Sequence, residues 1–433
     1  MIHKFQQNGD FIVLDVNSGA IHIVDKITYD ILDDYAPGGD NSGDAGALAE
    51  LDELVAEGLL FADTPGHEGA VANYTVKSLC LLVSQECNLR CAYCFAHEGA
   101  YHQAGRGLMD AATAQAAIDF LISNSGDRHN LEVDFFGGEP LLNFDVVKQT
   151  VDYARKIEGA AGKNIRFTIT TNGLLLDEEI TNYINENMQN VVLSLDGRRE
   201  INDAHRGAGT YDRLAAGFAD FANRREQDNY YIRGTFTARN PDFAADVLHL
   251  ADLGFRQISI EPVIAQKGDL RLDYSHIPQI LENYDILARE ILAREKNGNG
   301  FNFFHFMMNL ENSPCFEKRI SGCGAGYEYM AVMTDGRLYP CHQFAGIADF
   351  AIGDVFGGIS DADIPKKLAG CNVVNNPICA PCWAKYHCSG GCIANAYAEN
   401  GDINRPDEIG CILMKKRLEC AIWLAAARAQ QGD

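Results

Sequence analysis

Three cysteines lie within one short segment, Cys87, Cys91 and Cys94, with the spacing Cys-x3-Cys-x2-Cys. Three thiolates in one loop can ligate three irons of a [4Fe–4S] cluster and leave the fourth iron open to another ligand. A structural zinc site is the alternative, but such sites use four ligands and usually paired Cys-x2-Cys units. The segment therefore favours an iron–sulfur site with one open position.

The fourteen cysteines of the chain are clustered rather than scattered. None precedes Cys80, four lie between positions 80 and 94, and ten follow position 314. The N-terminus lacks the charged segment, apolar run and cleavage site of a secretory signal, so we expect a cytosolic protein whose thiols stay reduced. Metal binding is then the favoured use of the clustered cysteines.

A second dense set of cysteines lies toward the C-terminus, after long periodic segments fade at about Gly300. Its members are Cys323, Cys341, Cys379, Cys382, Cys388, Cys392 and Cys411. We expect this region to fold around metal rather than around a large apolar core, and a pair of zinc ribbons is the alternative. The other cysteines Cys80, Cys371 and Cys420 are interpreted mainly as small core residues.

Composition excludes several classes of partner. The chain has 433 residues, of which 47% are hydrophobic and 22% charged, and its formal net charge is −24. Such a charge repels phosphate backbones and anionic membrane surfaces, so nucleic acid and membrane are not expected as partners. A chain of this length and composition can form two or three domains with a substantial core, which suits an enzyme.

Six strand–helix units are predicted between about Thr75 and Lys296 to position the first cysteine motif. The expected strands are Ser78–Gln85, Leu131–Phe136, Ile165–Thr170, Val191–Leu195, Tyr231–Thr237 and Ile258–Val263. An amphipathic helical segment follows each strand, which predicts a parallel sheet and an α/β fold, a partial (β/α)6 TIM-type barrel open on one side. Residues at the C-terminal ends of such strands normally build the active site.

The first 75 residues are predicted to form a small module. Two β-rich runs flank Asn17-Ser18-Gly19 and predict a hairpin, and helical patterns follow near Ile27–Asp34 and Ala45–Glu57. A hairpin with two helices is typical of a winged-helix-like module. The predicted domains are therefore 1–75, 76–305 and 306–433.

The cysteine motif, with Tyr93 before its third cysteine, resembles the signature of the radical S-adenosylmethionine (SAM) superfamily. The segment Phe136-Gly137-Gly138-Glu139-Pro140 is similar to the GGEP motif of that family, whose backbone and glutamate hold the amino group of SAM. Thr170-Thr171-Asn172-Gly173 and Ser194-Leu195-Asp196-Gly197 end successive strands where the family contacts SAM. Taken singly, such short motifs are more often turns; in this order they support one another.

The resemblance implies a set of SAM contacts. Arg206 would be the cation for the SAM carboxylate, and Ile260 with Glu261 would face the adenosine. The cofactor-binding residues so implied are Tyr93, Gly137, Gly138, Glu139, Thr171, Asn172, Ser194, Asp196, Arg206 and Ile260. In that family the reduced cluster cleaves SAM to a 5′-deoxyadenosyl radical that abstracts hydrogen, and the catalytic cysteines would be Cys87, Cys91 and Cys94.

The C-terminal cysteines are similar to the seven-cysteine SPASM domain of radical SAM peptide maturases, which implies three [4Fe–4S] clusters in all. Carried over, Cys323, Cys341 and Cys392 would bind the first auxiliary cluster. The second would be bound by Cys379, Cys382, Cys388 and Cys411. Seven thiolates serve eight iron sites, so one iron is open unless Cys315 completes the set, and the sequence leaves this undecided.

The first thirty residues look like the start of the maturases of SCIFF peptides (six cysteines in forty-five residues). This implies an enzyme that forms a thioether crosslink in a ribosomally made cysteine-rich precursor peptide, whose leader binds the N-terminal module. An external one-electron reductant of the flavodoxin or ferredoxin type would supply electrons. A purely structural role for the module is the alternative.

Two rival functions remain. Anaerobic sulfatase-maturating enzymes share the barrel and the SPASM domain, but they lack the module and place an aspartate base after the cysteine that matches Cys341, where this chain has His342. A noncatalytic Fe–S electron carrier or peptide-binding scaffold is the rival of another class. It would not need SAM motifs on successive strands.

Overall fold

The computed structural model describes residues 1–64, 74–102, 107–225, 227–264, 268–308, 310 and 319–432. It contains two compact units, each discontinuous in sequence. Unit 1 comprises Met1–Val71, Ile277–Gly322 and Cys371–Asp433, and unit 2 comprises Ala72–His276 and Cys323–Gly370. The division into three domains at positions 75 and 305 stays a prediction.

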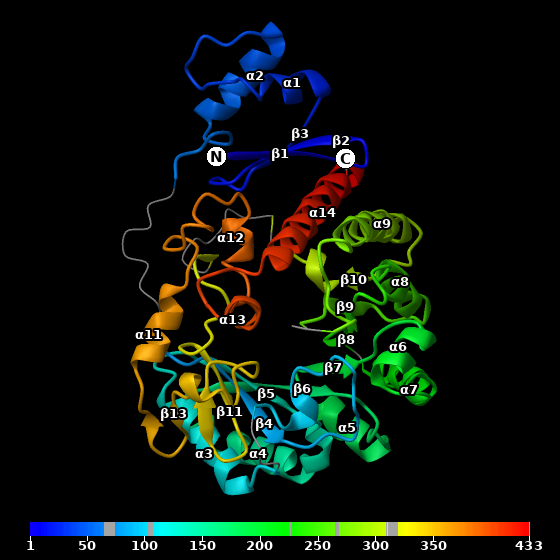
Figure 1. Ribbon diagram of the computed structural model, residues 1–433, viewed down its shortest axis with the longest axis vertical. Coiled ribbons are helices and arrows are strands. Elements are labelled where there is room, and N and C mark those ends of the chain that lie inside the picture. The colour runs from blue at the N-terminus through cyan, green and yellow to red at the C-terminus, as the bar shows by residue number, and fades with distance from the viewer. Residues whose placement is uncertain are drawn as a thin grey trace. The chain divides into compact units, whose positions relative to one another are not determined.

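Unit 2 is built on a largely parallel sheet (Figure 1). The six predicted strands are confirmed as β4 (Ser78–Ser84), β5 (Asn130–Gly137), β6 (Asn164–Thr171), β7 (Asn190–Ser194), β8 (Tyr230–Phe236) and β9 (Gln257–Pro262). They pair in parallel in this order. The structure therefore confirms the α/β fold with a parallel sheet.

The sheet also extends beyond β4 by strands that the sequence did not reveal. These are β11 (Tyr329–Val332), β12 (Arg337–Tyr339), β13 (Gly353–Asp354) and β14 (Gly358–Ile359). β11 pairs in parallel with β4, and the last three continue as antiparallel neighbours. Each of these strands has only two to four residues, which is too short for a periodic pattern to predict it.

Helices follow strands β4 to β8 as predicted and lie along one face of the sheet (Figure 1). They are α3 (Ala111–Ser123), α4 (Phe144–Ile157), α5 (Glu178–Asn187), α6 (Arg199–Arg206), α7 (Thr210–Arg224) and α8 (Ala244–Asp252). A further helix of unit 2, α11 (Asp363–Gly370), follows β14 and was not predicted. Short 3₁₀ helices are η1 (His97–Gly99), η2 (Pro140–Asn143) and η4 (Ala348–Phe350). Side chains of Asp110 and Asp177 cap α3 and α5 by accepting from backbone N–H groups.

Strand β5 shows how the sequence positions a site. Leu131, Val133 and Phe135 are fully buried, and Phe135 stacks on Phe167 of β6 with ring centroids 5.6 Å apart. Because successive side chains of a strand point to opposite faces, Asp134 and Phe136 must point to the other face. That other face carries the polar residues described below.

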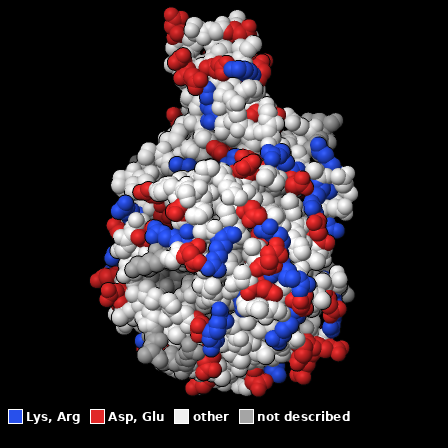
Figure 2. Space-filling model, turned by 45° about the vertical axis from the view of Figure 1, so that its right-hand side comes forward, with Lys and Arg blue, Asp and Glu red and all other residues white. Residues whose placement is uncertain are grey.

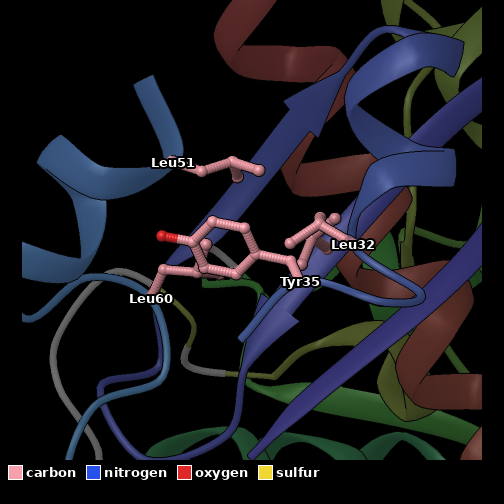
Figure 3. Close-up of a cluster of buried hydrophobic side chains, with 5 residues drawn as sticks. Leu32, Tyr35, Leu51 and Leu60 are labelled. Atoms are coloured by element: carbon pink, nitrogen blue, oxygen red, sulfur yellow. The ribbon is translucent and has the colours of Figure 1, made fainter. Parts of the chain in front are cut away.

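Unit 1 contains an antiparallel sheet of β1 (Ile2–Gln7), β2 (Asp10–Asp15) and β3 (Ile21–Val24). The predicted hairpin is confirmed as β2–β3, whereas β1 was not predicted. Helices α1 (Lys26–Ile31) and α2 (Ala45–Ala56) follow, with Asp25 and Asp44 as N-caps. A core of Val13, Leu32, Tyr35, Leu51 and Leu60 joins the sheet to these helices (Figure 3).

The rest of unit 1 is mainly helical. Its elements are α9 (Ile277–Lys296), β10 (Asn302–Phe303), η3 (Phe304–Phe306), α12 (Lys385–Cys388), α13 (Ile393–Asn400) and α14 (Glu408–Gly432). Helices α9 and α14 pack together, and the Arg417 guanidinium donates a 2.8 Å hydrogen bond to the Tyr284 hydroxyl.

None of the helices described is both long and apolar enough to cross a bilayer. Acidic and basic side chains are interspersed on the face drawn in Figure 2.

Candidate radical SAM site

A cavity of about 260 Å³ opens in unit 2 at the C-terminal ends of the parallel strands. It is lined by the cysteine loop after β4, by the ends of β5 to β9, and by the segment after β12. Predicted residues in the lining are Cys87, Cys91, Cys94, Tyr93, Gly137, Gly138, Thr171, Asn172, Ser194 and Arg206. The structure thus brings most of the predicted SAM contacts and all three cysteines of the motif to one place.

The three thiols are held in a loop that supplies backbone donors to sulfur. The N–H of Leu89 donates to Cys87 Sγ at 3.4 Å, and the N–H of Glu98 donates to Cys94 Sγ at 3.3 Å. Burial, and to a lesser degree neighbouring thiols, raises the pKa of Cys91 to about 11. Iron ligation removes such protons, because thiolates and not thiols bind metal.

This donor set fits an iron–sulfur cluster better than a single ion. Within the described part of the chain, no three His, Cys, Asp or Glu side chains converge as ligands of one metal ion would. Thiolates that each bind a different iron of one cluster stand farther apart than ligands of one ion. Three sulfurs facing one cavity, with room beside them for a further ligand, suit an incompletely ligated cluster.

The glycine pair at the end of β5 is required by backbone packing. A Cβ on Gly138 would stand 2.2 Å from the carbonyl oxygen of Glu86, and one on Gly137, whose φ is +136°, would stand 2.3 Å from that of Ser84. The N–H of Gly138 donates to the carbonyl of Ser84 at 2.7 Å, and the N–H of Glu139 donates to the carbonyl of Glu86 at 2.8 Å. The pair therefore holds the cysteine loop against the sheet, which only residues without a Cβ permit at these positions.

Glu139 lies behind the cavity wall rather than in it. Its side chain, 1% exposed, accepts from the Thr171 hydroxyl at 2.6 Å and from the backbone N–H of Asn172 at 2.8 Å. Burial raises the pKa of Glu139 to about 7. The Asn172 amide donates to Asn88 Oδ1 at 2.7 Å, so Glu139 links the end of β6 to the cysteine loop. Its predicted contact with the SAM amino group stays a prediction.

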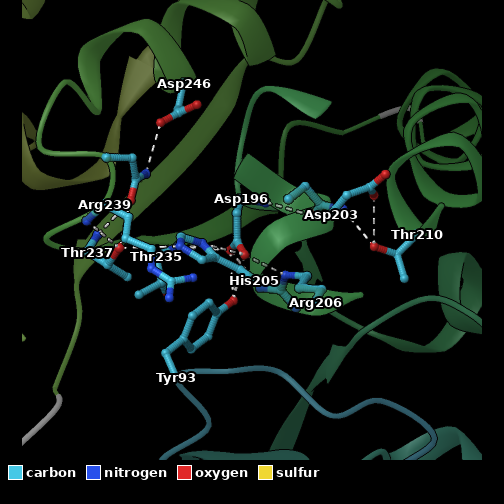
Figure 4. Close-up of polar contacts among 12 residues, drawn as sticks. Tyr93, Asp196, Asp203, His205, Arg206, Thr210, Thr235, Thr237, Arg239 and Asp246 are labelled. Atoms are coloured by element: carbon cyan, nitrogen blue, oxygen red, sulfur yellow. Dashed lines mark hydrogen bonds and ion pairs between the residues drawn. The ribbon is translucent and has the colours of Figure 1, made fainter. Parts of the chain in front are cut away.

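Asp196 is the centre of a buried polar network (Figure 4). Its carboxylate, fully buried, accepts from Arg206 Nε and Nη2 at 3.0 and 2.9 Å and from the Tyr93 hydroxyl at 2.8 Å. Burial opposes ionisation, but the Arg206 guanidinium outweighs it and holds the pKa of Asp196 below its usual value. The network fixes Tyr93, which lies between Cys91 and Cys94 in the sequence, and Asp196 itself does not line the cavity.

Of the two predicted adenosine contacts at the end of β9, one lines the cavity and the other does not. Ile260 is fully buried and is not part of the cavity lining, whereas Glu261 and Pro262 are. Glu261 accepts from Arg233 Nη2 at 2.8 Å. The structure therefore does not bring Ile260 to the cavity, because its side chain points to the other face of the strand.

Several lining residues were not predicted as site residues. Among them are Asp134, Thr170, Arg233, Thr235 and His342. The His342 ring stacks on Phe136 with centroids 5.1 Å apart, and its Nδ1 lies 3.2 Å from the Tyr329 hydroxyl. Burial, followed by the nearby Arg233, lowers the pKa of His342 to about 4. The strand alternation that places Phe136 inward could have identified Asp134 as well.

A second group of thiols gathers in unit 1. Burial, and then Cys411, Cys379 and Cys382 in that order, raises the pKa of Cys388 to about 12. The backbone N–H of Cys382 donates to the carbonyl of Cys379 at 2.9 Å. The structure thus brings together the four cysteines that the sequence assigned to a second auxiliary cluster.

The other predicted set is distributed differently. Cys323 and Cys341 lie in unit 2 and Cys392 lies in unit 1, and Cys315 lies outside the described residues. The ligation of a first auxiliary cluster by these residues stays a prediction. Cys80 and Cys420 are buried, as expected of core residues, and Cys371 is partly buried with its thiol donating to Asn404 Oδ1 at 3.1 Å.

Comparison with known proteins finds a family match for part of the chain that lines the cavity. Residues 81–237 match the sequence model of the Radical SAM superfamily. The cysteine-type anaerobic sulfatase-maturating enzyme of Clostridium perfringens is 28% identical over 341 residues, 71% of this chain and 86% of the relative. The radical SAM cyclopropyl synthase TigE of Paramaledivibacter caminithermalis is 23% identical over 362 residues, 78% of this chain and 72% of TigE. A Methanocaldococcus jannaschii protein is 38% identical over 128 residues, which span only 41% of its length.

Solved structures share the fold. Native anSMEcpe with bound AdoMet superposes with a TM-score of 0.67 at 19% identity, covering 81% of this chain and 98% of that chain. Streptococcus suis SuiB bound to precursor peptide SuiA gives a TM-score of 0.58 at 17% identity, covering 94% of this chain and 98% of that chain. The sheet and cavity of unit 2 thus have a radical SAM fold, and the chain is related to radical SAM enzymes.

Proposed function

We propose that this chain is a radical SAM peptide maturase that joins a cysteine sulfur to a backbone or side-chain carbon in a ribosomally made cysteine-rich precursor peptide. The observation that carries the proposal is the single cavity lined jointly by the cysteine loop, the strand-end motifs and further polar side chains. Relatives support the substrate class, because anSMEcpe has been solved with AdoMet and a Cp18Cys peptide and SuiB with its precursor peptide.

The residues that would hold the cofactors face this cavity. Cys87, Cys91 and Cys94 would ligate a [4Fe–4S] cluster, and SAM would lie against the ends of β5, β6 and β7. When bound, these cofactors supply a 5′-deoxyadenosyl radical that takes a hydrogen atom from a peptide carbon, and an auxiliary cluster supplies the acceptor for the surplus electron.

The chain's own residues exclude water and orient the substrate. Phe95, Phe136, Val263 and Ile264 give the cavity an apolar wall, which protects a reactive radical from stray hydrogen donors. The Arg233–Glu261 ion pair presents charge beside that wall, with half of the Arg233 side chain exposed. A peptide backbone entering the cavity therefore meets both apolar surface and hydrogen-bonding groups.

The auxiliary sites complete the proposal. Cys379, Cys382, Cys388 and Cys411 would fully ligate one [4Fe–4S] cluster. Cys323, Cys341 and Cys392 would ligate another, with an open iron available to a substrate thiolate unless Cys315 fills it. A preparation in which four protein cysteines ligate this cluster would contradict direct binding of the substrate sulfur.

The N-terminal module would recognise the leader peptide. In the sheet order β1-β2-β3, strand β3 is an edge, and Ile23 on it is 38% exposed. An extended leader could pair with such an edge through main-chain hydrogen bonds. Binding the leader there raises the local concentration of the core peptide at the enzyme.

Sulfatase maturation is the second candidate, favoured by the 28% identity to the Clostridium perfringens enzyme. His342 argues against it, because the resemblance places an aspartate base at this position. The pKa of His342 near 4 keeps the imidazole neutral at physiological pH, so it cannot supply the negative charge of a carboxylate. An electron carrier, the rival of another class, would not need a cavity beside its cluster.

An anaerobic assay separates these functions. The reconstituted protein is mixed with dithionite, SAM and a synthetic cysteine-rich precursor, and deoxyadenosine and peptide mass are measured together. Loss of two hydrogens per link, resistant to reduction and alkylation, supports the thioether. SAM cleavage with an unchanged peptide would exclude this substrate class. Absence of SAM cleavage in a protein with intact clusters would favour the noncatalytic electron carrier.

A further inference from the structure

One carboxyl group in the cavity is not used by the network that holds the cysteine loop. Asp134 lies on the inward face of β5, and its side chain lines the cavity together with the three cysteines of the motif. Its Oδ1 is buried and, among the described residues, has no hydrogen-bond partner. A buried carboxyl oxygen without a partner is costly, which indicates that a bound molecule completes it.

The neighbours of Asp134 do not neutralise it. Thr170 of β6 hydrogen-bonds the carboxyl group, and the Arg233 cation of β8 is close enough to favour its ionised form. The Arg233 guanidinium, however, makes its 2.8 Å ion pair with Glu261 and not with Asp134. The carboxyl group thus has a cation nearby but no direct salt bridge among the interactions described.

The other faces of the site contribute uncharged groups. Cys80 of β4, Tyr101 and Tyr329 of β11 interact electrostatically with Asp134, and partial or full burial raises the pKa of each. His342, across the cavity, is neutral for the same reason. Asp134 and Glu261 are therefore the ionisable carboxyl groups in the described lining that lie away from the cysteine loop.

We propose that the Asp134 carboxylate contacts the peptide in this cavity and accepts the proton of the cysteine thiol that becomes the thioether. This inference rests on the proposed function and deepens it. The S–H bond breaks and its proton goes to Asp134 as sulfur and carbon form the C–S bond. The hydrogen atom of that carbon leaves in 5′-deoxyadenosine, and the remaining electron goes to a one-electron acceptor of the iron–sulfur class.

The acidity of the group suits this role. Burial raises the pKa of Asp134 from 3.8 to about 7. A general base works best when its pKa lies near the operating pH, since it is then both ionised and basic. The assignment makes Asp134 a catalytic residue in the sense that it touches the reacting thiol.

The test compares Asp134→Asn with wild type in the reconstituted holoenzyme, using the synthetic cysteine-rich precursor. Single-turnover crosslinking and deoxyadenosine formation are followed across pH. The wild-type crosslinking rate should rise as pH rises through about 7. The variant should crosslink roughly a hundredfold more slowly, without this rise in rate near pH 7, while still forming deoxyadenosine. Asp134→Glu should restore part of the rate. The control is Glu132→Gln, a surface carboxylate of the same strand paired with Arg166 at 2.7 Å.

A second readout does not depend on turnover. The raised pKa means that the folded protein binds more protons than the unfolded chain between pH 3.8 and about 7, so wild-type stability falls as pH rises through that window. The thermal midpoint of Asp134→Asn should therefore rise relative to wild type over the same window and then level off. Glu132→Gln should show no such trend.

The outcomes separate the two hypotheses. If wild type forms deoxyadenosine but no crosslink, the proposed function fails. If wild type crosslinks and Asp134→Asn keeps its rate and pH profile, only the role of Asp134 is overturned. If the variant loses deoxyadenosine formation together with crosslinking, Asp134 acts before the thiol step and the proton-acceptor role is wrong.

Discussion

The two groups of cysteines in this protein differ in what surrounds them. In unit 2, Cys87, Cys91 and Cys94 face a cavity of about 260 Å³ lined by polar strand ends. In unit 1, Cys379, Cys382 and Cys411 lie close enough to Cys388 to help burial raise its pKa, and none of these four cysteines lines the cavity described in this unit. The first group therefore has three thiols beside open space, and the second has four thiols gathered together.

Under the proposed function, the three-thiol site carries out the reaction and the four-thiol site transfers electrons. A three-thiol site leaves one iron of a cluster for a cofactor, whereas a four-thiol site satisfies every iron with protein. Under the proposed function, we therefore expect one iron at the cavity site to stay open to a cofactor. We expect the four-thiol site, called the closed site below, to stabilise the fold and to transfer electrons. The predictions below test this contrast.

The largest effect is expected from Cys94→Ala in the cavity site. Because the three thiolates act as a unit, one substitution should abolish SAM cleavage as fully as replacing all three. Deoxyadenosine and iron content are measured after anaerobic reconstitution. Cys371→Ser, outside both groups, is the control and should leave both values unchanged. Residual cleavage near the wild-type rate would contradict the assignment.

Gly138→Ala should come next. Its new Cβ would collide with the carbonyl oxygen of Glu86 and press on Cys87, so the cysteine loop must move. A displacement near 1 Å at a reacting centre can lower the rate about a hundredfold. SAM cleavage per bound cluster measures this. Gly159→Ala, where a Cβ would meet nothing within 4 Å, is the matched control. Equal rates for both variants would show that the close packing is unimportant.

Asp196→Asn should act on stability. Removing the carboxylate leaves the buried Arg206 cation unpaired, which we expect to cost about 3 kcal/mol. The pKa of Asp196 is below its usual 3.8, so the stabilisation is present above that pH and is lost as pH falls through the folded-state pKa. Anaerobic denaturant unfolding at neutral pH measures the difference. A loss within experimental error would mean that the network is not structural.

The smallest effect on SAM cleavage is expected from Cys411→Ala in the closed site. The variant should contain about four irons fewer per chain, the content of one [4Fe–4S] cluster, and should crosslink peptide more slowly. Its SAM cleavage should remain close to wild type, since the cavity site is intact. Iron content, deoxyadenosine and peptide mass are measured on one preparation. Loss of SAM cleavage in a variant that still folds would contradict the assignment of different roles to the two sites.

The sequence predicted the elements with strong periodicity. All six parallel strands, the hairpin around Ser18 and the helices of unit 2 are present. Strands β11 to β14 were missed because two to four residues carry too little pattern, and β1 because its polar residues mask the alternation. The pairing of β11 with β4 joins segments about 250 residues apart, which no local pattern can reveal.

The structure brings residues of local motifs to the cavity, whereas the position of other predicted residues depends on packing that the sequence does not show. The three cysteines were named from their spacing and the glycine pair from the resemblance, and all of them line the cavity. Glu139 and Asp196 were expected at the ligand, but the structure places them behind the cavity wall, holding Thr171 and Arg206. Ile260 and Glu261 were both named because the cavity-facing side of β9 could not be chosen in a strand that is buried along most of its length. Asp134 lacked any motif.

We propose above that the cavity of unit 2 performs radical chemistry on a peptide carbon. The most direct measurement uses a precursor peptide deuterated at its candidate acceptor carbons, incubated anaerobically with the reconstituted enzyme, SAM and dithionite. The account predicts that deuterium appears in 5′-deoxyadenosine as the crosslinked peptide forms, and that Cys94→Ala eliminates both signals. Crosslinked peptide accompanied by unlabelled deoxyadenosine, or label transfer that survives in Cys94→Ala, would contradict it.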